Sequence, residues 1–192
     1  MADLGAAAAL AGRLAPDVAD ALLARAVVAP VDHPTGVEAD ASRPAEDRAV
    51  LTRRTAPLLL LDRPRHPGNA GAAVRVAAAA GASGVAVTGD LDPWHPAVLR
   101  GSAGLHYALP VLRCTPDEPA GPVLVLDAGG DVLTAVPDDA VVVVGSERTG
   151  VGDALRARAD AVVSLPMRDG VSSLNLATAA SAALYAWRLA RR

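Results

Sequence analysis

Five short apolar runs set the strongest limit on how this chain can fold. They cover residues 58–61, 85–87, 123–126, 141–144 and 162–163, and Leu and Val make up nearly all of them. Each run is about as long as a strand and is continuously apolar, without the alternation of a strand that has one solvated face. We therefore expect strands that other elements cover on both faces.

Segments with helical character lie between these runs. An Ala-rich stretch at residues 71–80 follows the first run, and Gly81 after it suits a helix C-cap. Residues 152–159 separate the fourth and fifth runs, and residues 174–192 form the last and longest predicted helix. Strands and helices in alternation predict an α/β fold, with a mostly parallel sheet that carries helices on both faces.

The first 55 residues follow a different pattern. Residues 1–29 show a weak helical spacing of apolar side chains that Pro16 interrupts, and residues 30–56 are more polar and contain prolines. We interpret residues 30–56 as a linker or a small irregular subdomain, with a basic, substrate-facing arm as the alternative. The predicted domains are a short N-terminal helical or irregular extension at 1–55 and a main domain at 56–192.

Composition narrows the classes of partner and cofactor. The net charge is −3 and all 18 basic residues are Arg, so a nucleic acid would have to bind a local Arg patch. The single Cys114 excludes an internal disulfide and a thiolate zinc cluster, and the four His residues lack metal-ligand spacing, so we expect no metal.

The beginning of the chain predicts no membrane contact. The apolar residues 6–11 are too few to span a bilayer, and Asp3 without an early basic residue argues against a signal peptide. We therefore expect a soluble, cytoplasmic protein.

A first candidate motif, Asn69-Ala70-Gly71 followed by Arg75, lies where the first strand gives way to a helix. Backbone N–H groups and a helix N-terminus at such a turn would face an anion, and Arg75 could direct its guanidinium at a phosphate. The turn lacks the G-x-G-x-x-G spacing of dinucleotide-binding folds, so a nicotinamide-dependent enzyme is only a distant alternative.

A second motif, G-S-E-R-T-G at residues 145–150, directly follows the fourth apolar run. Its two glycines would let a ligand lie close to the backbone. The carboxylate of Glu147 could orient a polar group, or it could cap the helix that follows.

A third motif, Ser173-Leu174-Asn175, opens the last predicted helix. Ser173 suits an N-cap at least as well as it suits catalysis. A Ser nucleophile would need a G-x-S-x-G elbow and a later His, and no His follows residue 106, so hydrolysis is excluded.

Taken together and in this order, the motifs resemble the SpoU/TrmH family of RNA ribose 2′-O-methyltransferases, which belongs to the SPOUT class. The matching patterns are N-x-G-x-x-x-R at 69–75, G-x-E-x-x-G at 145–150, and D-x-x-V-x-L-P-M with S-L-N between residues 160 and 175. The segments R-G-S-A-G at 100–104 and L-P-V at 109–111 also look like the family's middle region. The resemblance covers residues 57–190.

The resemblance implies a fold and a cofactor that composition and spacing do not reveal. In this family the C-terminal segment threads a loop to form a trefoil knot, a rare exception to unknotted topology. The methyl donor S-adenosylmethionine lies in that knot and is held largely by backbone groups. The positions that match its binding residues are Leu126, Gly145, Leu165, Met167 and Leu174.

The resemblance also implies the substrate and the assembly. The substrate would be an RNA, either tRNA or rRNA, and the protein a homodimer whose active site lies near the subunit interface. The last helix, with Leu184, Tyr185 and Trp187, suits a dimer surface and a core equally. The segment at 1–55 would be a possible remnant of a larger RNA-binding domain. The loop arginines grouped as RNA contacts are Arg53, Arg54, Arg63, Arg65, Arg148 and Arg168.

The catalytic positions implied by the resemblance are Asn69, Arg75, Glu147, Ser173 and Asn175. Family proposals make the arginine the base that takes the hydroxyl proton. Because Arg is normally protonated, Arg75 could instead clamp a phosphate and stabilise the developing alkoxide. Two alternatives stay open: a knotted protein that binds S-adenosylmethionine or RNA without catalysis, and a SPOUT methyltransferase that modifies a guanine nitrogen.

Overall fold

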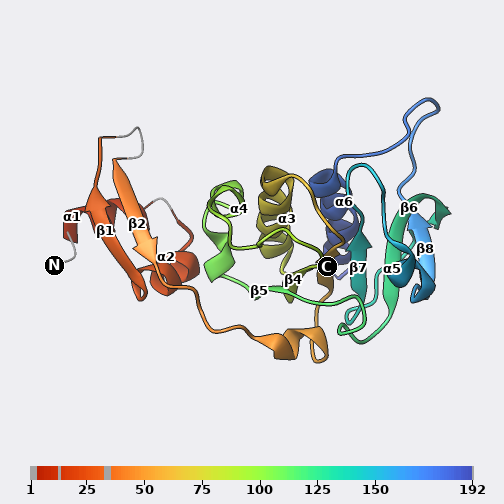
Figure 1. Ribbon diagram of the computed structural model, residues 1–192, viewed down its shortest axis with the longest axis horizontal. Helices are drawn as coiled ribbons and strands as arrows, with labels where there is room; N and C mark the ends of the chain where they lie inside the picture. Colours follow the sequence, from red (N-terminus) through yellow and green to blue (C-terminus); the bar gives the residue numbers. More distant parts are fainter. Residues whose placement is uncertain (1–3, 13, 33–35, 192) are drawn as a thin grey trace. The chain divides into compact units, whose positions relative to one another are not determined.

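The computed structural model describes residues 4–12, 14–32 and 36–191 (Figure 1). The chain divides into two compact units, Met1–Ala45 and Glu46–Arg192. This division falls between residues 45 and 46, whereas the sequence suggested a boundary between 55 and 56. All of the residues proposed for catalysis or cofactor binding belong to the second unit.

The second unit is built on a six-stranded parallel sheet with the strand order β5-β4-β3-β7-β6-β8. Its strands are β3 (Leu58–Leu61), β4 (Gly84–Val87), β5 (Val111–Arg113), β6 (Val123–Val132), β7 (Val141–Val144) and β8 (Ala161–Ser164). Five of them coincide with the five apolar runs, which confirms the predicted parallel sheet. Strand β5 was missed because it has only three residues and ends on the exposed Arg113.

Helices accompany this sheet: α3 (Pro67–Ala80), α4 (Pro96–Gly101), α5 (Asp153–Ala157) and α6 (Leu176–Leu189). The 3-10 helices η1 (Arg48–Leu51) and η2 (Leu105–Tyr107) lie in connecting segments. Helix α3 ends at Gly81 as predicted, where a left-handed φ of 76° turns the chain. Helix α4 was not predicted; only its last two residues, Arg100 and Gly101, were noted, for their resemblance to the family.

Both faces of the sheet are covered, as the continuous apolar runs require. Alternate residues of a strand point to opposite faces. Leu59 and Leu61 of β3 pack in one cluster with α3, α4 and α6, whereas Leu58 and Leu60 pack in another with α5. None of these four leucines has exposed surface. Figure 1 shows α3 and α6 side by side over the sheet.

Helix α6 begins later than predicted. Residues 174–192 were expected to be helical with Ser173 as a possible N-cap, but the first helical residue is Leu176. Asn175 is the N-cap, and its Oδ1 accepts the Ala177 N–H at 2.9 Å. The N-cap of α6 is therefore the Asn of the last motif and not its Ser.

Two of the three residues considered for a dimer surface belong to the core of this chain. Leu184 and Trp187 are buried, and only Tyr185 is exposed. The Trp187 indole Nε1–H donates to Asp138 Oδ1 at 2.8 Å, which fastens α6 to the segment between β6 and β7. Burial of Leu184 and Trp187 thus serves the fold of the single chain.

The first unit contains α1 (Leu4–Ala11), α2 (Pro16–Leu23) and the antiparallel strands β1 (Ala26–Pro30) and β2 (Val37–Ala41). Strand β2 corrects our interpretation of residues 30–56 as a linker or an irregular subdomain, and β1 occupies the end of the segment 1–29, for which we expected a helical pattern. Their sequences, A-V-V-A-P and V-E-A-D-A, contain mostly residues that strands disfavour, so propensity gave little signal. Among the described helices, none combines the length and hydropathy needed to cross a bilayer.

Candidate functional site

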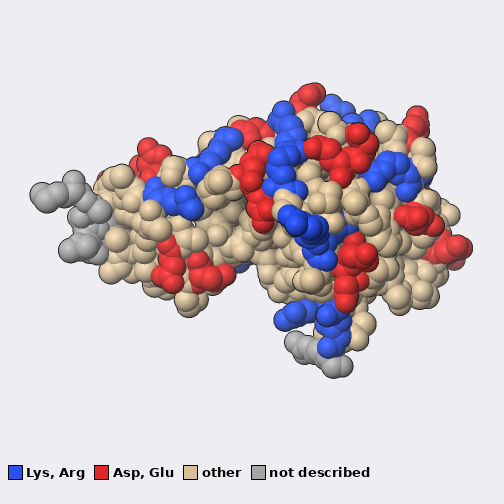
Figure 2. All heavy atoms as spheres, turned by 90° about the horizontal axis from the view of Figure 1, so that it is seen from below, with Lys and Arg blue, Asp and Glu red and all other residues tan. Residues whose placement is uncertain are grey.

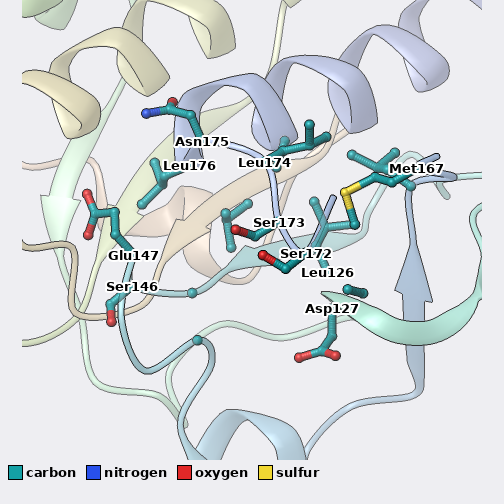
Figure 3. A pocket seen from close by; sticks show the side chains of 16 residues that line it. Leu126, Asp127, Ser146, Glu147, Met167, Ser172, Ser173, Leu174, Asn175 and Leu176 are labelled. Carbon is teal, nitrogen blue, oxygen red and sulfur yellow. The ribbon is translucent and has the colours of Figure 1, made fainter. Parts of the chain in front are cut away.

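The motif segments meet at the carboxyl end of the sheet around a cavity of about 570 Å³. Its walls come from the middle of β6, from residues at and after the carboxyl ends of β7 and β8, and from the first turn of α6 with the segment that leads into it. In Figure 3, Glu147 and Ser146 lie on one side, Ser172 and Ser173 in the middle, and Met167 on the opposite side. The carboxyl edge of a parallel sheet is the usual place for a ligand in an open α/β fold.

All five residues predicted to bind the cofactor line this cavity: Leu126, Gly145, Leu165, Met167 and Leu174. Four of them contribute apolar side chains, and the fifth contributes only backbone. The prediction therefore brought together positions from four separate segments of the chain. Cofactor binding by these residues stays a prediction.

Gly145 leaves no room for a side chain. A Cβ at this position would lie 2.2 Å from the carbonyl carbon of Gly150. The closeness arises because the turn closes on itself: Ser146 N–H donates to Gly150 O at 3.1 Å, and Gly150 N–H donates to Ser146 O at 3.0 Å. Gly150 supplies the positive φ of 64° that the turn requires. Both glycines of the motif are thus required by geometry.

Three of the predicted catalytic residues form a hydrogen-bonded chain at the edge of the cavity. Asn69 Nδ2 donates to Glu147 Oε1 at 2.7 Å, and Asn175 Nδ2 donates to Asn69 Oδ1 at 3.0 Å. Glu147 Oε2 also accepts the backbone N–H of Arg65 at 3.2 Å. The chain joins the start of α3, the turn after β7 and the start of α6.

Glu147 determines the direction of the hydrogen bonds that link Glu147, Asn69 and Asn175. Partial burial acts to raise the pKa of Glu147, but hydrogen bonds from the Asn69 amide and from backbone N–H groups outweigh it and lower the pKa. An ionised carboxylate only accepts hydrogen bonds, so Asn69 must turn its NH₂ group toward Glu147 and its oxygen toward Asn175. The second Nδ2–H of each Asn takes no part in these hydrogen bonds, and this donor is available to a ligand.

The other two predicted catalytic residues lie in different surroundings. Ser173 is part of the cavity wall, in the same lining as Glu147 and Asn175. Arg75 lies outside the wall, exposed on α3, and forms no hydrogen bond or ion pair with the described residues. Six residues of helix correspond to about 600° of rotation, so Arg75 and Asn69 point in different directions. A single chain therefore gathers four of the five candidates.

Asp127 is a lining residue that the sequence analysis overlooked. It directly follows Leu126, where the pairing of β6 with β8 shifts register. Its Oδ1 accepts the Gly129 N–H at 2.9 Å and its Oδ2 pairs with Arg156, and these bonds lower the pKa of Asp127. An acidic residue immediately after the apolar run 123–126 was the signal that could have found it.

The structure corrects one of the arginines assigned to RNA. Arg54 donates to the carbonyl oxygen of Leu51 at 2.9 Å and to those of Ala120 and Asp139. Burial lowers the pKa of Arg54. Its guanidinium therefore fastens three loops of the fold and is unsuited to an RNA phosphate.

The remaining arginines of that group stay on the surface. Arg63 pairs with the buried Asp62 at 3.2 Å, and Arg53, Arg65, Arg148 and Arg168 are exposed. On the face shown in Figure 2, Arg side chains are interspersed with acidic ones rather than gathered into one basic field. This face therefore offers single arginines and small groups of them.

A parallel sheet with this cavity and this order of motifs defines an RNA methyltransferase fold of the SpoU/TrmH kind. The chain belongs to the SpoU rRNA Methylase family, which matches residues 56–185. The resemblance seen in the sequence is therefore confirmed.

Characterised and uncharacterised relatives share the larger part of this chain. The 23S rRNA (uridine(2479)-2′-O)-methyltransferase of Streptomyces viridochromogenes is 35% identical over 172 residues, which are 80% of this chain and 60% of the relative. An uncharacterized tRNA/rRNA methyltransferase of Mycobacterium bovis is 38% identical over 158 residues, 75% of this chain and 48% of the relative. The chain thus spans about half to three fifths of the length of these curated relatives.

Solved structures agree with this assignment. The SpoU methyltransferase AviRb from Streptomyces viridochromogenes, in complex with the cofactor AdoMet, superposes with a TM-score of 0.72 at 32% identity, covering 83% of this chain and 67% of that one. The AdoMet-bound rRNA methyltransferase from Sinorhizobium meliloti gives a TM-score of 0.72 at 29% identity, covering 83% and 66%. Both of these relatives bind AdoMet, which is S-adenosylmethionine.

Proposed function

We propose that this protein transfers a methyl group from S-adenosylmethionine to a ribose 2′-hydroxyl of an RNA, either tRNA or rRNA. The proposal rests on the hydrogen bonds that link Glu147, Asn69 and Asn175 at the edge of a cavity. All five expected cofactor positions line this cavity. Membership of the SpoU family supports the type of reaction.

The chemistry of the cavity fits S-adenosylmethionine. Leu126, Leu165 and Leu174 offer apolar surface to an adenine ring, and the backbone of Gly145 lies where no side chain can cover it. Asp127 offers a carboxylate that suits ribose hydroxyls, and the negative charges of Asp127 and Glu147 compensate a positive charge in the cavity. When bound, the cofactor supplies a methyl group on a positively charged sulfur.

Asn69 and Asn175 would hold the target ribose. Each keeps one amide N–H outside the chain, and such donors bind a ribose oxygen and favour the negative charge that develops on it. Glu147 acts through Asn69, whose orientation it fixes, and is therefore a positioning residue. Ser173 adds a hydroxyl from the cavity wall. Holding reacting atoms in line contributes about 7–11 kcal/mol in favourable cases.

Arg75 would clamp the phosphate beside the target ribose and stabilise the developing alkoxide. A guanidinium stays protonated and matches phosphate oxygens with paired N–H donors. Its separation from the cavity within one chain supports the expected homodimer, with the active site near the subunit interface. We further propose that residues 160–185, together with the loop at 145–150, form the trefoil knot, and that the protein acts on its RNA in the cytoplasm.

The proposal is tested first by cofactor binding. Calorimetric titration of S-adenosylmethionine into wild type, Arg75→Ala and Arg100→Ala should give saturable binding with equal affinity, because neither Arg lines the cavity. Absence of binding to the folded wild-type protein would count against the proposed cofactor site.

The reaction is then tested on tRNA and rRNA, followed by digestion to nucleosides. We expect a 2′-O-methyl nucleoside from wild type and Arg100→Ala, and a rate about 100-fold lower from Arg75→Ala. A methylated guanine base would replace the proposal by base methylation. Cofactor binding without any methylated nucleoside would favour a knotted binding protein.

A further inference from the structure

A second cavity, of about 460 Å³, lies at the same carboxyl edge of the sheet, beside α5. Its walls come from the segments after β3, β4 and β5 and from the first turn of α5. Cys114, Pro116 and Leu155 give it apolar walls, and the exposed Arg63 and Arg113 stand around them. None of the residues predicted for catalysis or cofactor binding takes part in it.

Asp62 connects segments that line this cavity. Its carboxylate is 3% exposed and accepts the Thr88 hydroxyl at 2.6 Å, the Gly152 N–H at 2.7 Å and the Arg63 guanidinium at 3.2 Å. These bonds tie together the segments that follow β3, β4 and β7. Arg63 itself has a left-handed φ of 50°, an unfavourable conformation for a residue with a side chain. A strained residue held by a buried hub is typical of a functional segment.

The two cavities share their connecting segments. Gly150 lines the first cavity and Gly152 the second, and two Cα steps span at most about 7.6 Å. The segment from Asp62 to Asn69 also joins them, because Asp62 is bound in the second cavity while Arg65 N–H and the Asn69 amide are bound to Glu147. A ligand in the second cavity would therefore lie next to the proposed methyl-transfer site.

The charges suit a flat, uncharged group better than a phosphate. Asp62 pairs with Arg63, and Asp153 adds a second carboxylate to the lining that contains Arg113. Guanidinium planes stack on nucleobases, and Arg binds base oxygens and nitrogens through paired donors. Arg113 donates to the Asp90 carbonyl at 3.0 Å, which fixes its position while only one of its five N–H groups is used there.

We propose that the second cavity binds an unpaired base of the substrate RNA, from a nucleotide next to the one that is methylated. Stacking on Arg63 and hydrogen bonds from Arg113 recognise the base, and the apolar walls exclude water from it. This inference rests on the proposed function and adds to it the part of the chain that selects the sequence around the target.

Two variants test the cavity against matched controls. Ala154→Trp fills it from α5, and Arg113→Ala removes a donor; Ala157→Trp on the same helix and the exposed Arg100→Ala serve as controls, since neither lines the cavity. We expect the first two to weaken RNA binding and raise KM for RNA roughly tenfold, the size of one lost base stack. Affinity for S-adenosylmethionine and the melting temperature should stay at wild-type values, as should all properties of the controls.

Abasic substrates identify the occupant. In a short RNA that wild type methylates, removing the neighbouring base should weaken binding roughly tenfold for wild type and not further for Ala154→Trp. Equal KM for all variants while wild type methylates RNA would overturn the cavity's role and leave the proposed function standing. A changed oligomeric state of Ala154→Trp in light scattering would also overturn it, by making the cavity a protein interface. If wild type neither binds nor methylates RNA, both proposals are wrong.

Discussion

Asn69 Nδ2 lies 2.7 Å from Glu147 Oε1, although 78 residues separate the two in the chain. The contact fixes the orientation of the Asn69 amide, because a carboxylate can only accept hydrogen bonds and the NH₂ group must therefore face it. Through Asn69 Oδ1 the same holds for the Asn175 amide, whose own oxygen caps α6. One carboxylate thus determines the orientation of both amide groups.

Replacement of Glu147 by Gln should therefore impair catalysis although the shape is kept. Gln offers one oxygen to two donors, Asn69 Nδ2 and Arg65 N–H, so one donor is left facing an NH₂ group. We expect kcat to fall about 10- to 100-fold in single-turnover methylation. Glu46→Gln, which changes an exposed carboxylate, is the control. A kcat within twofold of wild type would show that the direction of the hydrogen bonds between Glu147, Asn69 and Asn175 is unimportant for catalysis.

Asn175 has two tasks that substitutions can separate. Asn175→Asp keeps the oxygen that caps α6 but lacks the amide donor to Asn69, whereas Asn175→Ala loses both. We expect both variants to lose activity by about tenfold or more, and the Ala variant to lose about 1 kcal/mol of unfolding free energy as well. Urea denaturation and methylation rates measure the two effects. An Asp variant with wild-type activity would remove the Asn69–Asn175 bond from the mechanism.

The parts of the fold that were predictable are those whose burial is uniform. A run such as residues 141–144 is covered on both faces, so four valines in succession identify it as a strand. The strands β1 and β2 have no such run, since their pairing depends on contacts within the first unit that alternation and propensity do not encode. Short elements such as β5 carry too few residues for any pattern.

The site was predictable only as a set of positions. Family resemblance supplied Asn69, Glu147 and Asn175, but the direction of their hydrogen bonds requires coordinates. It did not show that Arg75 stands apart from the cavity, because six residues along a helix change the direction of a side chain. It also did not separate core from surface in α6, where Trp187 is buried and finds its partner in Asp138.

Gly71 of α3 and Gly101 of α4 let two helix backbones approach each other. A Cβ at Gly71 would lie 2.4 Å from the Val98 carbonyl oxygen, whereas one at Gly68 meets nothing within 4 Å. We expect Gly71→Ala to destabilise the protein by about 1–3 kcal/mol and Gly68→Ala to stabilise it by about 0.4–1 kcal/mol. Both values come from urea denaturation. Equal stability of the two variants would show that α3 and α4 separate without cost.

His106 is buried and neutral. Its Nε2 lies 2.8 Å from the Pro93 carbonyl oxygen, which requires a proton on Nε2, so Nδ1 of the neutral ring carries none. The Ser102 hydroxyl lies 2.7 Å from Nδ1 and 2.9 Å from the Leu99 carbonyl oxygen. The Trp94 ring packs against it at 5.0 Å between centroids. Burial lowers the pKa of His106 to about 4, because a charged imidazolium would lose its hydration there.

Acid should therefore destabilise the protein through His106. The unfolded chain binds a proton near pH 6.5 and the folded one only near pH 4, so unfolding takes up a proton between these values and stability falls as pH falls. The loss should approach about 3 kcal/mol at pH 4. Urea denaturation from pH 7 to pH 4 measures it, and comparison with His106→Gln removes the contribution of carboxylates. Since the Gln variant has no proton to bind at this position, its stability should fall less steeply, and identical slopes would mean that folding does not shift the pKa of His106.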